Sequence, residues 1–132
     1  MLLLAVAICF DSPAMAIKFY GYDKCGTCRK AAQFLAARGI AAPMLPIREQ
    51  PPTRKELETM LASYNGDIRR LFNTSGQDYR ALKLSEKLPA LSRADALALL
   101  ASNGNLVKRP FVLRDGKGIV GFNDHAWQEF LA

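Results

Sequence analysis

Two cysteines separated by two residues carry the chemistry that this sequence suggests most directly. Cys25 and Cys28 lie in the segment 18–30 (KFYGYDKCGTCRK), at the end of an aromatic run. A thiol in the first turn of a helix is acidified, because free backbone N–H groups there stabilise a thiolate. Residues three apart share a helix face, so the two sulfurs could form a reversible disulfide. We predict a redox pair in which Cys25 is the nucleophile and Cys28 the resolving thiol.

A zinc site and two inert thiols are the alternatives for this pair. A structural zinc ion needs four ligands, and within the domain only His125 remains to join the two cysteines. Three cysteines in 132 residues do not make a disulfide scaffold, and Cys-x-x-Cys beside a βαβ pattern is typical of a redox motif in a reducing compartment. We therefore predict redox chemistry, no metal, no resident cofactor and a cytoplasmic location.

The elements around the pair follow from hydrophobic periodicity. The aromatic run before Cys25 predicts a buried strand, and residues 27–38 predict a helix with an apolar stripe. Residues 40–47 predict a second strand, parallel to the first because a helix connects the two. The Cys-x-x-Cys turn then lies at the carboxyl end of a parallel strand, where open α/β sheets place their sites.

The second half of the chain predicts helices and then a hairpin. Residues 53–103 are expected to be helical throughout, with Thr53 and Glu56 as a capping box. Strands at 106–113 and 119–122 flank an Asp115-Gly116 turn, and residues 124–131 form a last helix. We predict an α/β fold with a mixed four-stranded sheet and an all-helical insertion between a βαβ half and a ββα half. Residues 17–132 form one domain.

Composition leaves several partner classes open. The net charge is +6, but the basic residues occur in ones and twos, with no long run and no interleaved aromatics. A solvated basic surface or an anion site explains this charge better than a nucleic-acid patch. We expect no direct nucleic-acid binding, no membrane association and a monomer.

Residues 1–16 (MLLLAVAICFDSPAMA) are not expected to belong to the fold. Their apolar run is too short to span a bilayer and resembles the core of a signal peptide, but no basic residue precedes it. Met15 lies directly before the first strand and would be a natural translation start. We favour a mis-assigned start over a signal peptide.

Four motifs in order resemble the arsenate reductase/Spx family of thioredoxin-like proteins, in its branch with a Cys-x-x-Cys motif (Spx and MgsR). They are residues 20–29 (YGYDKCGTCR), 71–80 (LFNTSGQDYR), 106–110 (LVKRP) and 120–122 (VGF). The resemblance covers residues 17–131 and implies a thioredoxin-like, glutaredoxin-like fold.

The resemblance also implies roles for individual residues. Cys25 is the catalytic nucleophile, Arg109 binds an oxyanion or steadies the thiolate, and the Arg109–Pro110 peptide bond is cis. A guanidinium offers a bidentate fork to an oxyanion and keeps its charge, which suits this role. Arg29, one residue after Cys28, is a further candidate for anion binding, with a solvated helix position as the alternative.

Two departures from the family pattern weaken arsenate as the substrate. Arsenate-reducing members use two further arginines, which align with Asn73 and with a position near Gly121 in this chain. Those enzymes generally have serine where this chain has Cys28, and they use glutathione and glutaredoxin to resolve the oxidised cysteine.

Two functions follow from these comparisons. The first is an oxidoreductase that reduces a disulfide or an oxyanion such as arsenate, with glutathione/glutaredoxin or thioredoxin as the external reductant. The second is a redox-sensing transcription regulator that binds the RNA polymerase α-subunit and responds to a Cys25–Cys28 disulfide, as Spx does.

Overall fold

The computed structural model describes residues 17–132, so both interpretations of residues 1–16 lie outside it. A mixed four-stranded sheet has the order β2-β1-β3-β4. Its strands are β1 (Lys18–Gly21), β2 (Met44–Pro46), β3 (Phe111–Arg114) and β4 (Lys117–Val120). β1 pairs with β2 in parallel and with β3 antiparallel, and β3 pairs with β4 antiparallel. This is the predicted βαβ and ββα arrangement of the thioredoxin-like fold.

Two strands are shorter than the sequence predicted. The segment 40–47 is extended only at Met44–Pro46, because the Ile40 N–H donates to Leu35 O at the end of the preceding helix and Pro43 has no N–H to donate. In the segment 106–113, the strand begins only at Phe111, the first residue of β3. Pro110 likewise lacks a donor, and Val107 bridges to Phe72 outside the sheet.

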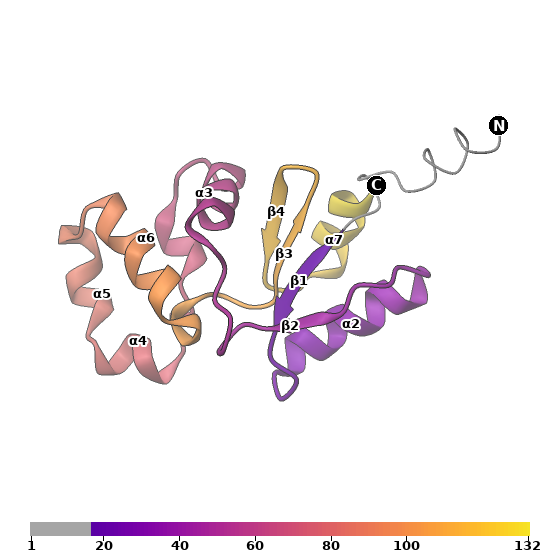
Figure 1. Ribbon diagram of the computed structural model, residues 1–132, viewed down its shortest axis with the longest axis horizontal. Helices are drawn as coiled ribbons and strands as arrows, with labels where there is room; N and C mark the ends of the chain where they lie inside the picture. The colour runs from indigo at the N-terminus through magenta and orange to yellow at the C-terminus, as the bar shows by residue number, and fades with distance from the viewer. Residues whose placement is uncertain (1–16) are drawn as a thin grey trace, which may run out of the picture.

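The two faces of the sheet support separate hydrophobic clusters, as strand alternation requires. Phe19, Val112 and Ile119 face α2 (Gly26–Ala37) and α7 (Asp124–Leu131), where Trp127 is fully buried. Tyr20 and Phe111 face the other way, towards the helical insertion. Figure 1 shows α2 and α7 on one side of the sheet and the insertion on the other.

The insertion consists of short helices, as predicted for residues 53–103, but turns interrupt it at residues 64–67 and 72–76. Ser92 caps one of its helices by accepting from the Asp95 N–H. No helix among residues 17–132 is long and apolar enough to cross a membrane. The elements of the insertion are α3 (Arg54–Ser63), η2 (Ile68–Leu71), α4 (Gln77–Ala81), α5 (Leu84–Lys87), η3 (Leu88–Ala90), α6 (Arg93–Ser102) and η4 (Gly104–Leu106).

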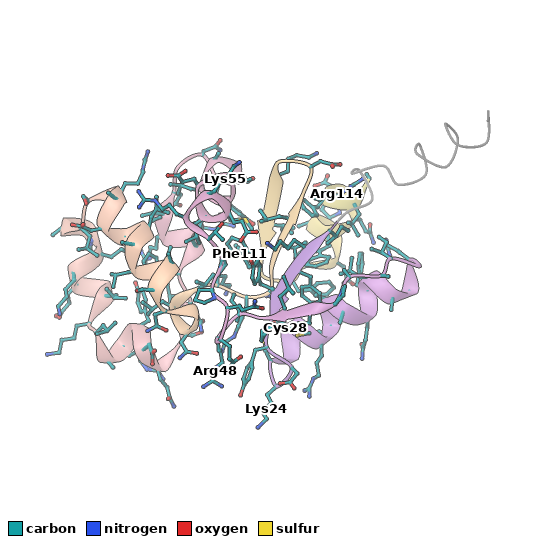
Figure 2. All side chains as sticks on the ribbon, in the orientation of Figure 1. Lys24, Cys28, Arg48, Lys55, Phe111 and Arg114 are labelled. Atoms are coloured by element: carbon teal, nitrogen blue, oxygen red, sulfur yellow. The ribbon has the colours of Figure 1, made fainter. Side chains whose placement is uncertain are left out.

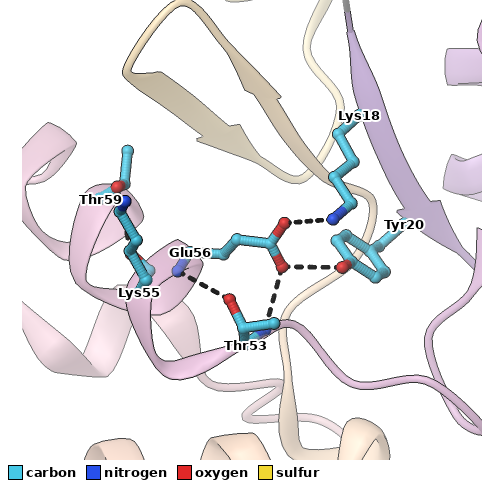
Figure 3. Close-up of polar contacts among 6 residues, drawn as sticks. All are labelled: Lys18, Tyr20, Thr53, Lys55, Glu56 and Thr59. Atoms are coloured by element: carbon cyan, nitrogen blue, oxygen red, sulfur yellow. Dashed lines mark hydrogen bonds and ion pairs between the residues drawn. The ribbon is translucent and has the colours of Figure 1, made fainter.

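A polar network fastens the start of α3 to β1. Thr53 and Glu56 form the predicted capping box, in which each side chain accepts from the other residue's backbone N–H. The Glu56 carboxylate also accepts from Tyr20 Oη at 2.7 Å and pairs with Lys18 Nζ at 2.5 Å (Figure 3). We call Lys18, Tyr20, Thr53 and Glu56 the Glu56 network. It joins the strand that leads to Cys25 to the insertion.

Candidate redox site

Cys25 is the N-cap residue of α2. After β1 ends at Gly21, a tight turn brings the Cys25 N–H to Tyr22 O at 3.0 Å, and Cys25 O accepts from the Arg29 N–H at 3.1 Å. The Cys25 sulfur accepts from the Cys28 backbone N–H at 3.4 Å. It also lies 3.1 Å from Thr27 Oγ1. The sulfur therefore lies where unpaired N–H groups and the helix dipole favour negative charge.

The surroundings of Cys25 favour its thiolate. Burial acts against ionisation, but hydrogen bonds from the Cys28 thiol, the Thr27 hydroxyl and the Cys28 backbone N–H outweigh it. Together with the charge of Arg109 they lower the pKa of Cys25 below its ordinary value. The side chain is partly exposed, so a substrate can reach this sulfur.

Cys28 has the opposite environment. It has no exposed surface, and its sulfur accepts from the Tyr22 N–H at 3.5 Å. Burial first, and then the hydrogen bond to Cys25, raise the pKa of Cys28 to about 12. A Cβ on Gly21 would lie 3.2 Å from the Cys28 sulfur, so the last residue of β1 must be small to leave room for it.

Arg109 has a donor with no partner. Its Nη1 is buried and has no hydrogen-bond partner among residues 17–132. The guanidinium stacks on the Tyr22 ring with 5.3 Å between Cζ and the ring centroid, and its charge favours both thiolates. The Arg109–Pro110 peptide bond is cis. A buried guanidinium N–H without an acceptor is costly, which suits a group that an anion completes.

Sequence reasoning missed Arg48 as a member of this region. Arg48 Cζ lies 4.7 Å from the Tyr22 ring centroid, so two guanidinium groups contact one aromatic ring. Figure 2 shows Arg48 and Lys24 at the lower edge of the view, Cys28 above them inside the molecule, and Lys55 at the upper edge. No sequence motif marks Arg48, because only the fold of the loop after β2 brings it to Tyr22.

A cleft of about 530 Å³ opens next to this site. We call it the basic cleft. Thr27 and Arg109 connect it to Cys25, and Arg70 and Lys108 add two positive charges. No Asp or Glu of residues 17–132 lines the cleft, whose other lining residues are Tyr64, Ile119, Val120, Gly121, Phe122, Asn123 and Ala126.

The remaining candidate residues differ in their relation to this cleft. Gly121 lines it and has a φ of 74°, a conformation that an arginine would adopt only with strain. Asn73 does not line it, and its backbone N–H donates to Leu106 O at 2.7 Å. Arg29 is exposed on α2, and its side chain has no hydrogen bond or ion pair with residues 17–132. Its role in anion binding stays a prediction.

The described residues offer no metal site. Residues 17–132 contain no group of three His, Cys, Asp or Glu side chains placed to hold a metal ion. His125 lies on α7 and pairs with Glu129 at 3.7 Å, so it joins neither cysteine.

The sequence resembles both redox enzymes and regulators. A protein from Bacillus subtilis, the uncharacterized protein YusI, is 44% identical over 115 residues, which cover 87% of this chain and 98% of that protein. The regulatory protein MgsR of the same organism is 28% identical and covers 81% of this chain and 83% of its own length. An arsenate reductase from Rhizobium meliloti is also 28% identical, over 75% of this chain and 69% of its own length.

Solved structures agree with the fold described above. An ArsC family related protein from Bacteroides fragilis is 39% identical, with a TM-score of 0.82 over 90% of this chain and 99% of that one. A possible arsenate reductase from Streptococcus mutans is 38% identical, with a TM-score of 0.79 over 89% of this chain and 98% of that one. The ArsC family model matches residues 20–130. The chain therefore belongs to the ArsC family.

Proposed function

We propose that the protein is a thiol–disulfide oxidoreductase in which Cys25 attacks and Cys28 resolves. One observation carries the proposal: two adjacent thiols have opposite pKa shifts, with the lowered one accessible and the raised one buried. The thiolate is the nucleophile in disulfide exchange, so this difference assigns the two roles.

The reaction proceeds in two exchanges. The Cys25 thiolate attacks one sulfur of a substrate disulfide, forms a mixed disulfide and releases the other half as a thiolate. The Cys28 thiol gives its proton to that thiolate or to water, attacks the Cys25 sulfur and releases the second half. The substrate gains two electrons and becomes two thiols, and the protein loses two electrons and forms the Cys25–Cys28 disulfide.

The first exchange prepares the second. The hydrogen bond to Cys25 and the negative charge of its thiolate are among the causes that raise the pKa of Cys28. Both disappear once the Cys25 sulfur is in a mixed disulfide, so Cys28 ionises more readily at the step that needs it. Cys28 therefore stays protonated until a substrate is bound covalently.

Turnover needs an external reductant, because each cycle leaves the protein oxidised by two electrons as the Cys25–Cys28 disulfide. Thioredoxin, or glutathione with glutaredoxin, would return the Cys25–Cys28 disulfide to two thiols. Arsenate is a less favoured substrate than a disulfide. The family's additional arginines are replaced by Asn73 and Gly121, and the φ of 74° at Gly121 disfavours arginine there.

A direct test is to add one equivalent of a disulfide to the reduced protein and to map the product by mass spectrometry. The proposal predicts two substrate thiols per protein and a single intramolecular Cys25–Cys28 disulfide. A protein that remains fully reduced, or that is oxidised elsewhere, would contradict it. Arsenate with glutathione and glutaredoxin is the second substrate to measure, and turnover at the disulfide rate would reverse our ranking of the two.

A redox-sensing regulator is the second candidate function. Its support is the similarity to MgsR and to the global transcriptional regulator Spx of Streptococcus pyogenes, which is 27% identical over 108 residues. The partner would be the RNA polymerase α-subunit. Binding of purified α-subunit that changes between the reduced and the oxidised protein would favour this function. Equal or undetectable binding in both states would exclude it.

A further inference from the structure

The charges of the basic cleft are not explained by thiol exchange alone. Exchange needs a thiolate and a resolving thiol, which Cys25 and Cys28 provide. Arg70 comes from η2 in the insertion, whereas Lys108 comes from the loop before β3. Two separate parts of the chain thus place cations in one cleft that no acidic side chain of residues 17–132 lines.

Contacts within the cleft position the side chains of Arg70 and Lys108. Arg70 Cζ lies 4.6 Å from the Tyr64 ring centroid, and Tyr64 Oη accepts from the Val120 N–H at 2.9 Å. The aromatic ring therefore holds the Arg70 guanidinium against β4. Lys108 Cε lies 3.6 Å from the position that a Cβ on Gly121 would occupy. This is van der Waals distance, so the Lys108 side chain lies directly beside Gly121 at the edge of the cleft.

The cleft connects to the reacting sulfur through Thr27. The Thr27 hydroxyl lies 3.1 Å from the Cys25 sulfur, and the same residue lines the cleft with Arg109. A substrate whose sulfur meets Cys25 would therefore extend past Thr27 and Arg109 towards Arg70 and Lys108. A volume of about 530 Å³ suits a small molecule.

We propose that Arg70 and Lys108 bind a carboxylate of a small-molecule disulfide while Cys25 attacks its sulfur. The inference rests on the proposed function and adds the substrate class: a disulfide that carries a carboxylate. Two cations on separate segments hold the carboxylate, and Arg109, whose charge favours the Cys25 thiolate, lines the same cleft. The reacting half of the substrate is the half held in the cleft.

Two chromogenic disulfides of different charge test this proposal. 5,5′-Dithiobis(2-nitrobenzoate) carries carboxylates, and 4,4′-dithiodipyridine carries none. The rate constants for oxidation of the reduced protein are measured by stopped flow for the wild type, Arg70→Gln and Lys108→Gln. Lys55→Gln is the matched control, since Lys55 is a lysine on α3 that does not line the cleft. The reaction with the neutral disulfide is the internal reference for each variant, and circular dichroism reports whether the variant is folded.

We expect each cleft variant to react about tenfold more slowly with the anionic disulfide. Its rate with the neutral disulfide should stay within about twofold, and Lys55→Gln should match the wild type with both. Added salt should lower the anionic rate of the wild type more than that of the variants. Equal changes with both disulfides, or none, would overturn the carboxylate site and leave the proposed function intact. Failure of both disulfides to oxidise Cys25 in the wild type would overturn the proposed function itself.

Discussion

The Glu56 network and the Cys25 site both depend on β1, but they handle charge in opposite ways. In the Glu56 network, Lys18 pairs with the Glu56 carboxylate, which also accepts from Tyr20 Oη and the Thr53 N–H. At the Cys25 site, Arg109 keeps a buried donor without a partner among the described residues. The Glu56 carboxylate is thus fully engaged by protein groups, whereas the Arg109 donor has no partner among residues 17–132.

This difference separates a stabilising network from a reactive site. A carboxylate whose acceptors are filled holds α3 against β1 and offers nothing to a substrate. A guanidinium with a free donor and an accessible thiolate costs stability and is retained for binding or chemistry. Substitutions in the Glu56 network should therefore change stability with little effect on thiol reactivity, and substitutions at the Cys25 site should do the reverse.

The largest effect is expected at the two cysteines. Cys25→Ser should reduce disulfide-exchange activity to the level without protein, because the thiolate is lost. Cys28→Ser should form a stable mixed disulfide at Cys25, because no second thiol releases the substrate. Mass spectrometry after a stoichiometric addition distinguishes the two products. Full activity of Cys25→Ser would contradict the assignment.

Arg109→Gln comes next. Without the guanidinium charge, the last of the contributions that lower the pKa of Cys25, this pKa should rise, and thiolate reactivity at neutral pH should fall by up to about tenfold. The rate of Cys25 alkylation in the variant and in the wild type measures this change in reactivity. Arg109→Lys should recover part of the loss, since it keeps the charge without the planar fork. An unchanged rate in Arg109→Gln would remove Arg109 from the site.

Glu56→Gln tests the closed network. The variant should lose about 1–2 kcal/mol of unfolding free energy, because it weakens the capping box and the contacts with Lys18 and Tyr20. Burial opposes ionisation of Glu56, but Lys18, Thr53 and Tyr20 lower its pKa. The difference in unfolding free energy between variant and wild type is therefore largest above the unfolded-state pKa of about 4.3. It shrinks as the pH falls through the lower pKa that Glu56 has in the folded protein.

Urea denaturation between pH 3 and 7 measures this difference. The same variant should react at Cys25 within about twofold of the wild-type rate, since none of the groups that lower the pKa of Cys25 belongs to the Glu56 network. A stability loss that grows as the pH falls would mean that Glu56 is not held ionised in the folded protein.

The smallest effect is expected for Thr27→Val. This change removes the hydroxyl 3.1 Å from the Cys25 sulfur but keeps the side-chain shape. One hydrogen bond to the thiolate corresponds to about a 2- to 10-fold fall in alkylation rate. Thr27→Ser keeps the hydroxyl and serves as the matched control. Equal rates for Thr27→Val and Thr27→Ser would show that the hydroxyl does not steady the thiolate.

Local signals in the sequence were sufficient for most of the fold. The capping box at Thr53 and Glu56 and the Asp115-Gly116 turn both form as predicted, because each depends on residues a few positions apart. The ends of β2 and β3 were wrong, because prolines without N–H groups and local hydrogen bonds such as Ile40 N to Leu35 O override strand propensity.

The candidate site could be predicted only in part. Cys25 at the start of α2 follows from its own sequence neighbours. Arg48 against Tyr22, and Arg70 beside Lys108, depend on how distant loops pack, and no motif records that packing. Only the packing of η2 against α3, with Arg70 over the Tyr64 ring, brings Arg70 to the cleft.

The pH dependence of thiol alkylation tests the central claim most directly. The reduced wild type, Cys25→Ser and Cys28→Ser would be treated with iodoacetamide from pH 4 to 10, and the modified residue identified by mass spectrometry. We predict that Cys25 reacts with an apparent pKa below the ordinary value of about 8.5. In the reduced wild type Cys28 should react far more slowly than Cys25, because it is buried and its pKa is raised to about 12. Equal reactivity of the two thiols, or faster reaction at Cys28, would contradict the account.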